Sequence, residues 1–181
     1  MMKATGVVRR IDDLGRIVIP KEIRKTLRIK EGTPLEIFTE KEGNIILKKY
    51  SPIGELTNFS EQYVNSLYNT TNLISIVTDK DSVVAVSGTS KKDLLEVPIS
   101  EELEKIIDSR KTAIDEGTKK ISIIKDGPIN EKHKIITPII SDSEVIGSVI
   151  LISKEQNRKI SNAEIEIAKV ASNFLGCQLE I

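Results

Sequence analysis

The sequence is poor in the side chains that build catalytic and metal sites. Its 181 residues include one cysteine, one histidine and no tryptophan. Cys177 has no partner for an internal disulfide, and one cysteine with one histidine cannot supply the four ligands of a structural zinc site. Nucleophilic catalysis needs a base beside the nucleophile. His133 lies between two lysines, and Cys177 lies on the apolar stripe of the last expected helix, where we expect it to pack as a small hydrophobe. We therefore expect no catalytic residue, no metal site and no enzyme.

Long apolar runs and phosphate-binding glycine motifs are also missing. No stretch approaches the run of about 18 apolar residues that a membrane helix needs. Lys3, Arg9 and Arg10 leave no room for the apolar core of a signal peptide. Neither the Walker pattern nor the dinucleotide glycine pattern occurs. We expect a soluble cytoplasmic protein without a cofactor.

The net charge of the whole chain is also zero, but the charge is not evenly distributed along the sequence. The 27 Lys/Arg residues balance 27 Asp/Glu residues. Residues 1 to 50 hold 12 basic and 7 acidic side chains, a net charge of +5, whereas residues 51 to 181 hold 15 and 20, a net charge of −5. Such asymmetry indicates a short, anion-binding module at the N-terminal end of the sequence.

The first fifty residues have the pattern of short strands around one helix. Residues 5 to 12 are rich in β-branched side chains and predict a strand, and residues 17 to 19 predict a second. Pro20 favours a helix over residues 20 to 27. Residues 35–38 and 45–47, on either side of a glycine turn, predict a hairpin. Fifty residues bury too little surface to be stable alone, so we expect this module to dimerise.

The pattern changes at residues 51 to 54, where proline and glycine end the strands and the charge changes sign. We place an N-terminal domain at 1–50, a linker at 51–55 and a second domain at 56–181. In the second domain, periodicity predicts helices over 56–68 and 100–111 and from Ser161 onward. It predicts strands over 73–78, 83–86, 121–124, 134–140 and 145–152. Ser161 and Glu164 form a capping-box pattern at the last helix. The fold class is therefore α+β.

Six candidate DNA-binding residues, all basic, lie within twenty positions of the N-terminal domain. They are Arg9, Arg10, Arg16, Arg24, Lys25 and Arg28. The planar guanidinium of arginine binds phosphate in a bidentate way, although a solvated basic face remains the alternative. Residues 1 to 30 contain no aromatic side chain on which unpaired bases could stack, which favours duplex DNA over RNA or single strands. We take the six as candidate DNA-binding residues.

The N-terminal residues are recognisable as a motif. The run from Lys3 to Leu27, with Arg9-Arg10-Ile11-Asp12-Asp13-Leu14-Gly15-Arg16 at its centre, and its continuation Leu35-Glu36-Ile37-Phe38 resemble the AbrB-type swapped-hairpin DNA-binding domain. The resemblance implies a β-barrel in which two chains interleave their hairpins. It also implies that Arg9, Arg16 and Arg24 contact DNA. The fourth such position falls on Lys25, which lacks the bidentate fork, so we expect a phosphate contact there.

The second domain carries a weaker motif. Thr137-Pro138-Ile139-Ile140, followed by Glu144 to Ile150, is similar to the closing hairpin of GAF domains. The Asn-Lys…Phe signature of cyclic-nucleotide GAF domains is absent, so any small-molecule ligand is unidentified. Together the two domains resemble a family of endospore regulators. That resemblance implies an activator and repressor of sporulation genes at the nucleoid of the developing spore, with promoter DNA as partner and a homodimer that pairs into a tetramer through GAF helices.

Two other functions stay open. One is a DNA-binding antitoxin, because antitoxins share the swapped-hairpin fold, although they usually carry a short tail and not about 130 residues of patterned sequence. The other is a small-molecule sensor whose N-terminal domain serves only to dimerise.

Overall fold

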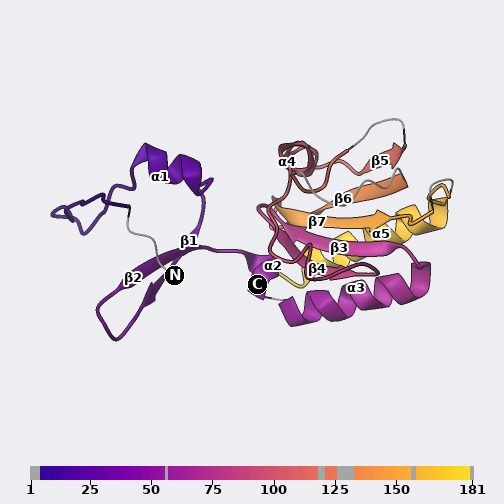
Figure 1. Ribbon diagram of the computed structural model, residues 1–181, viewed down its shortest axis with the longest axis horizontal. Coiled ribbons are helices and arrows are strands. Elements are labelled where there is room, and N and C mark those ends of the chain that lie inside the picture. The colour runs from indigo at the N-terminus through magenta and orange to yellow at the C-terminus, as the bar shows by residue number, and fades with distance from the viewer. Residues whose placement is uncertain (1–4, 56, 118–120, 126–132, 156–157, 180–181) are drawn as a thin grey trace. The chain divides into compact units, whose positions relative to one another are not determined.

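The computed structural model describes residues 5–55, 57–117, 121–125, 133–155 and 158–179. The chain divides into two compact units, Met1–Tyr50 and Ser51–Ile181, and each is described by itself (Figure 1). Among the described residues, no helix is long and apolar enough to span a bilayer.

The first unit contains one helix and one hairpin. Helix α1, Lys21–Thr26, begins after Pro20, whose fixed φ of −58° suits the first turn. Strands β1, Leu35–Thr39, and β2, Ile45–Lys49, pair antiparallel from Leu35 with Lys49 to Thr39 with Ile45. The predicted helix and hairpin are confirmed.

The strands predicted over 5–12 and 17–19 are wrong for the single chain. Among the described residues, 5–20 form no strand. A strand needs a neighbour that accepts and donates ladder hydrogen bonds, and no described segment of this chain lies in register beside them. Their apolar side chains are exposed, from 43% at Val7 to 86% at Val8. No described residue of this unit belongs to a buried core.

The second unit is built on an antiparallel sheet of five strands in the order β4-β3-β7-β6-β5. The strands are β3 Ile74–Asp79, β4 Val83–Ser87, β5 Ala113–Glu116, β6 His133–Ser141 and β7 Glu144–Ile152. The helices are α2 Pro52–Glu55, α3 Thr57–Thr71, α4 Glu101–Asp108 and α5 Asn162–Cys177. Residue 56, where the sequence predicted α3 to begin, lies outside the described residues.

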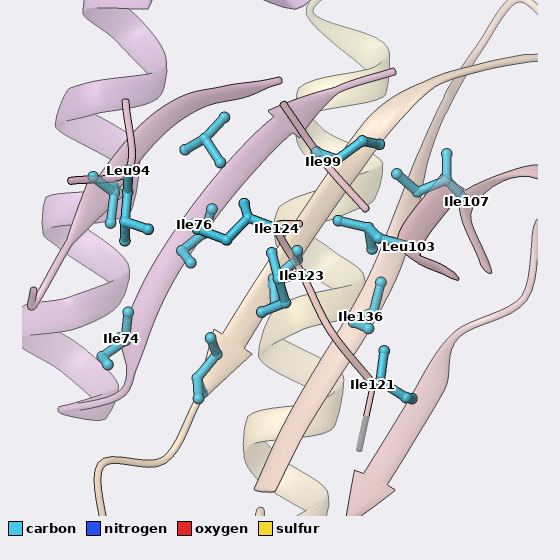
Figure 2. Close-up of a cluster of buried hydrophobic side chains, with 14 of the residues drawn as sticks. Ile74, Ile76, Leu94, Ile99, Leu103, Ile107, Ile121, Ile123, Ile124 and Ile136 are labelled. Atoms are coloured by element: carbon cyan, nitrogen blue, oxygen red, sulfur yellow. The ribbon is translucent and has the colours of Figure 1, made fainter. Parts of the chain in front are cut away.

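Alternating side chains give the sheet a core on each face. Residues such as Val77, Ile139 and Leu151 pack against α3 and α5. Residues of opposite parity, such as Ile76 and Ile150, pack against α4 and the loops around it. Figure 2 shows this second cluster, in which Leu94, Ile99, Leu103, Ile107, Ile121, Ile123 and Ile124 cover the sheet.

Three segments differ from expectation. Residues 121–124 form no regular strand; within them only Ile124 makes a β-bridge, an isolated one to Ile99. Their apolar side chains instead belong to the hydrophobic cluster shown in Figure 2. Strand β5 was not expected, since buried Asp115 interrupts the apolar alternation. Residues 51–55, expected as a linker, include α2, and Ile53 is 1% exposed within the second unit.

Candidate nucleic-acid interface

All six candidate basic residues are exposed in the first unit. Arg9 and Arg10 lie in the extended segment, and Arg16 follows the turn at 13–15. Arg24 and Lys25 lie on α1 and Arg28 comes just after it, in left-handed backbone at φ 53°. The six residues therefore come from two stretches of the first unit, Arg9 to Arg16 before α1, and Arg24 to Arg28 on α1 and just after it.

The turn before Arg16 is organised by Asp12. Its Oδ1 accepts hydrogen bonds from the backbone N–H groups of Leu14, at 3.0 Å, and Arg16, at 2.8 Å. Its Oδ2 accepts one from Nε of Arg16 at 2.8 Å. The backbone closes the same turn, because the N–H of Gly15 donates to the carbonyl of Asp12 and the N–H of Asp12 to that of Arg16. Gly15 has φ +77°, which glycine adopts without strain.

Electrostatics agree with this geometry. The backbone N–H of Arg16 and then its guanidinium hold the pKa of the Asp12 carboxyl below the ordinary 3.8. The carboxyl is therefore ionised at neutral pH and keeps all three hydrogen bonds. The Arg16 side chain is still 68% exposed, so its terminal nitrogens face solvent. From the sequence, Asp12 and Asp13 were interpreted as turn-forming residues and not as paired general acids and bases; the bond from Asp12 to the Arg16 side chain was not predicted.

The second unit buries His133, which was weighed as a catalytic base from the sequence, together with the neighbouring Lys134. His133 and Lys134 are 8% and 2% exposed at the start of β6. Nζ of Lys134 donates to the carbonyl of Ile121 at 2.6 Å and lies 4.0 Å from Oδ2 of Asp115. Asp115 in turn accepts from the N–H groups of Gly117 and Ile121. This buried pair ties the segment after β5 to β6, which is a structural role.

The remaining sequence predictions concern Cys177 and metal binding. Cys177 is exposed at the end of α5, so the expectation that it packs as a small hydrophobe is wrong, because the helix turns that position away from the sheet. No group of three or more His, Cys, Asp or Glu side chains with metal-binding geometry is found in the part of the chain that the structure describes.

A second surface combines side chains of α3 and α5. Phe59, Tyr63 and Phe174 form an aromatic cluster, with ring centroids 5.5 to 6.0 Å apart. Phe174 is 41% exposed and the neighbouring Val170 is 65% exposed. Burial in this cluster raises the pKa of the Tyr63 phenol. We call these four residues the aromatic patch.

Two solved structures share the fold of the second unit. The GAF domain of an Acinetobacter phosphoenolpyruvate-protein phosphotransferase aligns with a TM-score of 0.59 at 12% identity, covering 73% of this chain and 84% of that one. The cofactor-binding GAF domain of the nutrient sensor CodY from Clostridium difficile aligns with a TM-score of 0.53 at 14% identity, covering 66% and 83%. The predicted GAF-like fold is confirmed. The protein is thus of the class in which a short basic domain precedes a GAF domain.

Sequence comparisons identify the family. The family model described as stage V sporulation protein T C-terminal, transcription factor, matches residues 55–180, and that described as antidote-toxin recognition MazE, bacterial antitoxin, matches residues 8–55. Stage V sporulation protein T of Bacillus subtilis (strain 168) is 45% identical over 179 residues, 99% of each chain. The transition state regulatory protein AbrB of the same strain is 59% identical over 51 residues, 28% of this chain and 52% of AbrB. The chain belongs to the stage V sporulation protein T family.

Membership of this family confirms the main functional prediction. The protein is a DNA-binding transcription regulator of sporulation genes with an AbrB-type N-terminal domain. The antitoxin-type match covers residues 8–55, and the sporulation family matches residues 55–180.

Proposed function

We propose that the protein regulates transcription without catalysis, by placing arginines from two interleaved N-terminal domains on promoter DNA in the developing spore. The observation that carries the proposal is the exposure of Arg9, Arg16 and Arg24 in a domain that also exposes its apolar side chains. Arginines at these positions can reach base edges in the major groove. Arg10, Lys25 and Arg28 bind phosphates and fix the register of the domain on the duplex.

Exposed apolar residues support the interleaved dimer. Val8, Ile11, Leu14 and Val18 are 60% to 86% exposed in the single chain. Burying apolar surface contributes about 25 cal/mol per Å², so this segment gains most when a second copy supplies the neighbouring strands. A soluble domain rarely leaves so much apolar surface uncovered.

The aromatic patch supports the pairing of dimers into a tetramer. Its side chains come from α3 and α5; Phe59 and Tyr63 pack partly buried against the core, whereas Phe174 and Val170 are exposed. Aromatic residues in fully desolvated contacts contribute strongly to protein interfaces. A second copy of the same patch, related by two-fold symmetry, would cover it.

Arg16→Ala tests the DNA contact. Loss of a bidentate base contact costs about 1–3 kcal/mol, so we expect binding about 10-fold or more weaker to a duplex that the wild-type protein selects from a random library. Lys25→Ala should weaken binding equally on all sequences and lower the slope of log affinity against log salt by about 1. Lys41→Ala, an exposed lysine in the β1–β2 turn, is the control. Unchanged binding by the Arg16 variant in a mobility-shift assay would contradict the assignment.

Val170→Glu tests the tetramer. Two glutamates buried against the opposing patch would carry uncompensated charge, which a protein interface tolerates poorly. We expect light scattering to show dimers in place of tetramers, with the N-terminal dimer intact. Lys105→Glu introduces the same side chain at an exposed position of α4 and should leave the tetramer unchanged. A Val170 variant that still forms tetramers would place the contact elsewhere.

A further inference from the structure

The turn that presents Arg16 contains two adjacent acidic residues, although it belongs to the surface we assign to DNA. Two carboxylates beside a phosphate backbone should weaken binding by repulsion. The two differ in what they touch. Asp12 makes the three hydrogen bonds described above. The side chain of Asp13 makes no hydrogen bond or ion pair among the described residues, and it is exposed.

The two carboxylate oxygens of Asp12 accept different hydrogen bonds. Oδ1 holds the backbone of the turn through the N–H groups of Leu14 and Arg16. Oδ2 holds the guanidinium of Arg16 at Nε, 2.8 Å away. A guanidinium has five N–H donors in a fixed planar arrangement, and among the described residues Asp12 engages only the one on Nε. The two terminal nitrogens therefore remain available as a fork, and the side chain is 68% exposed.

We propose that Asp12 is a positioning residue for DNA binding: its carboxylate fixes the turn and aims the terminal nitrogens of Arg16 outward at the duplex. The inference rests on the proposed role of Arg16. An arginine side chain has many rotamers, and the entropy lost when DNA immobilises it reduces affinity. Asp12 restricts those rotamers before DNA arrives, so less entropy is lost on binding.

The proposed positioning role and simple electrostatics predict opposite changes in DNA affinity when the charge of Asp12 is removed. Removing a negative charge from a DNA-binding surface should strengthen binding if charge alone matters. Asp12→Asn keeps an oxygen that can accept the two backbone N–H groups but loses the ionic bond to the guanidinium. We expect this variant to bind the selected duplex about 3- to 10-fold more weakly, the cost of ordering one long side chain.

Asp13→Asn is the matched control, since it makes the same change of charge one residue away. The full-length variants are compared by fluorescence anisotropy on the selected duplex and on a duplex of random sequence. Asp13→Asn should bind both equally well or more tightly. Asp12→Asn should lose affinity for the selected duplex and keep its affinity for random DNA. Equal strengthening by both substitutions would overturn the inference.

A double variant separates this inference from the proposed function. If Asp12 acts through Arg16, adding Asp12→Asn to Arg16→Ala should cause no further loss, because contacting residues are not additive. A general structural role for Asp12 would instead add its loss to that of Arg16→Ala. If Arg16→Ala itself has no effect, the DNA contact fails. If Arg16→Ala weakens binding while Asp12→Asn matches Asp13→Asn, only the role of Asp12 fails.

Discussion

A single glycine decides how closely α5 approaches the sheet. A Cβ atom built on Gly176 would lie 2.1 Å from the carbonyl oxygen of Ile140 in β6. One turn earlier, the hydroxyl of Ser172 donates to the carbonyl of Pro138 in the same strand. The two contacts bring the helix backbone directly against strand carbonyls, so any side chain at position 176 must push α5 away from β6.

Gly176→Ala should therefore destabilise the second unit. Alanine gains about 1 kcal/mol over glycine in a helix interior. Overpacking against a backbone atom costs more, about 1–3 kcal/mol, because neither element can yield without losing its own hydrogen bonds. We expect a net loss of up to about 2 kcal/mol in urea unfolding followed by circular dichroism. Asn173→Ala, exposed on the same helix, should be near neutral, and equal stability of the two variants would contradict the prediction.

Elements that are signalled by neighbouring residues could be predicted from the sequence. The capping box at Ser161 and Glu164 is present, with the hydroxyl of Ser161 accepting from the N–H of Glu164 and the carboxylate returning to the N–H of Ser161. The β1–β2 hairpin follows from its glycine turn. Both signals lie within a few residues of the structure that they specify.

Whether a strand-like segment pairs in a sheet could not be predicted from its own residues alone. Residues 5–12 have strand-forming side chains, but a ladder needs a neighbour that their own described chain does not place there. Residues 121–124 also have strand-forming side chains, yet they form no strand and their isoleucines pack into the hydrophobic core over the sheet. In the candidate site, the basic residues were evident from their type, whereas the role of Asp12 appeared only with the geometry of the turn.

The capping box also gives an element-scale prediction. Ser161→Ala removes the side chain that satisfies the N–H of Glu164 at the start of α5. Loss of an N-cap costs about 1 kcal/mol, and we expect a loss of that size in thermal or urea unfolding. Ser161→Asp keeps an N-cap acceptor but places a second carboxylate beside Glu164, so it should recover part of the stability. An alanine variant as stable as wild type would show that Arg158, which also binds Glu164, holds the helix start alone.

At the scale of the whole molecule, the neutral chain consists of two units of opposite charge. The first carries a net charge of +5 and the second −5. DNA attracts the first through counterion release and repels the second. We therefore predict that the second unit lowers affinity for random DNA, which is held by charge alone. Binding to the selected duplex would also depend on the arginine contacts proposed above.

The last prediction isolates that effect. Residues 1–54, which carry the +5 charge, should bind random duplex DNA more tightly than the full-length protein at low salt. The comparison must hold the number of DNA-binding domains constant, so the full-length partner in the assay is the dimeric Val170→Glu variant. The difference should shrink as salt rises, because the Debye length falls from about 10 Å at 0.1 M to about 3 Å at 1 M. Equal affinities at low salt, measured by anisotropy, would mean that the acidic unit does not act on DNA and that selectivity arises in the N-terminal domain alone.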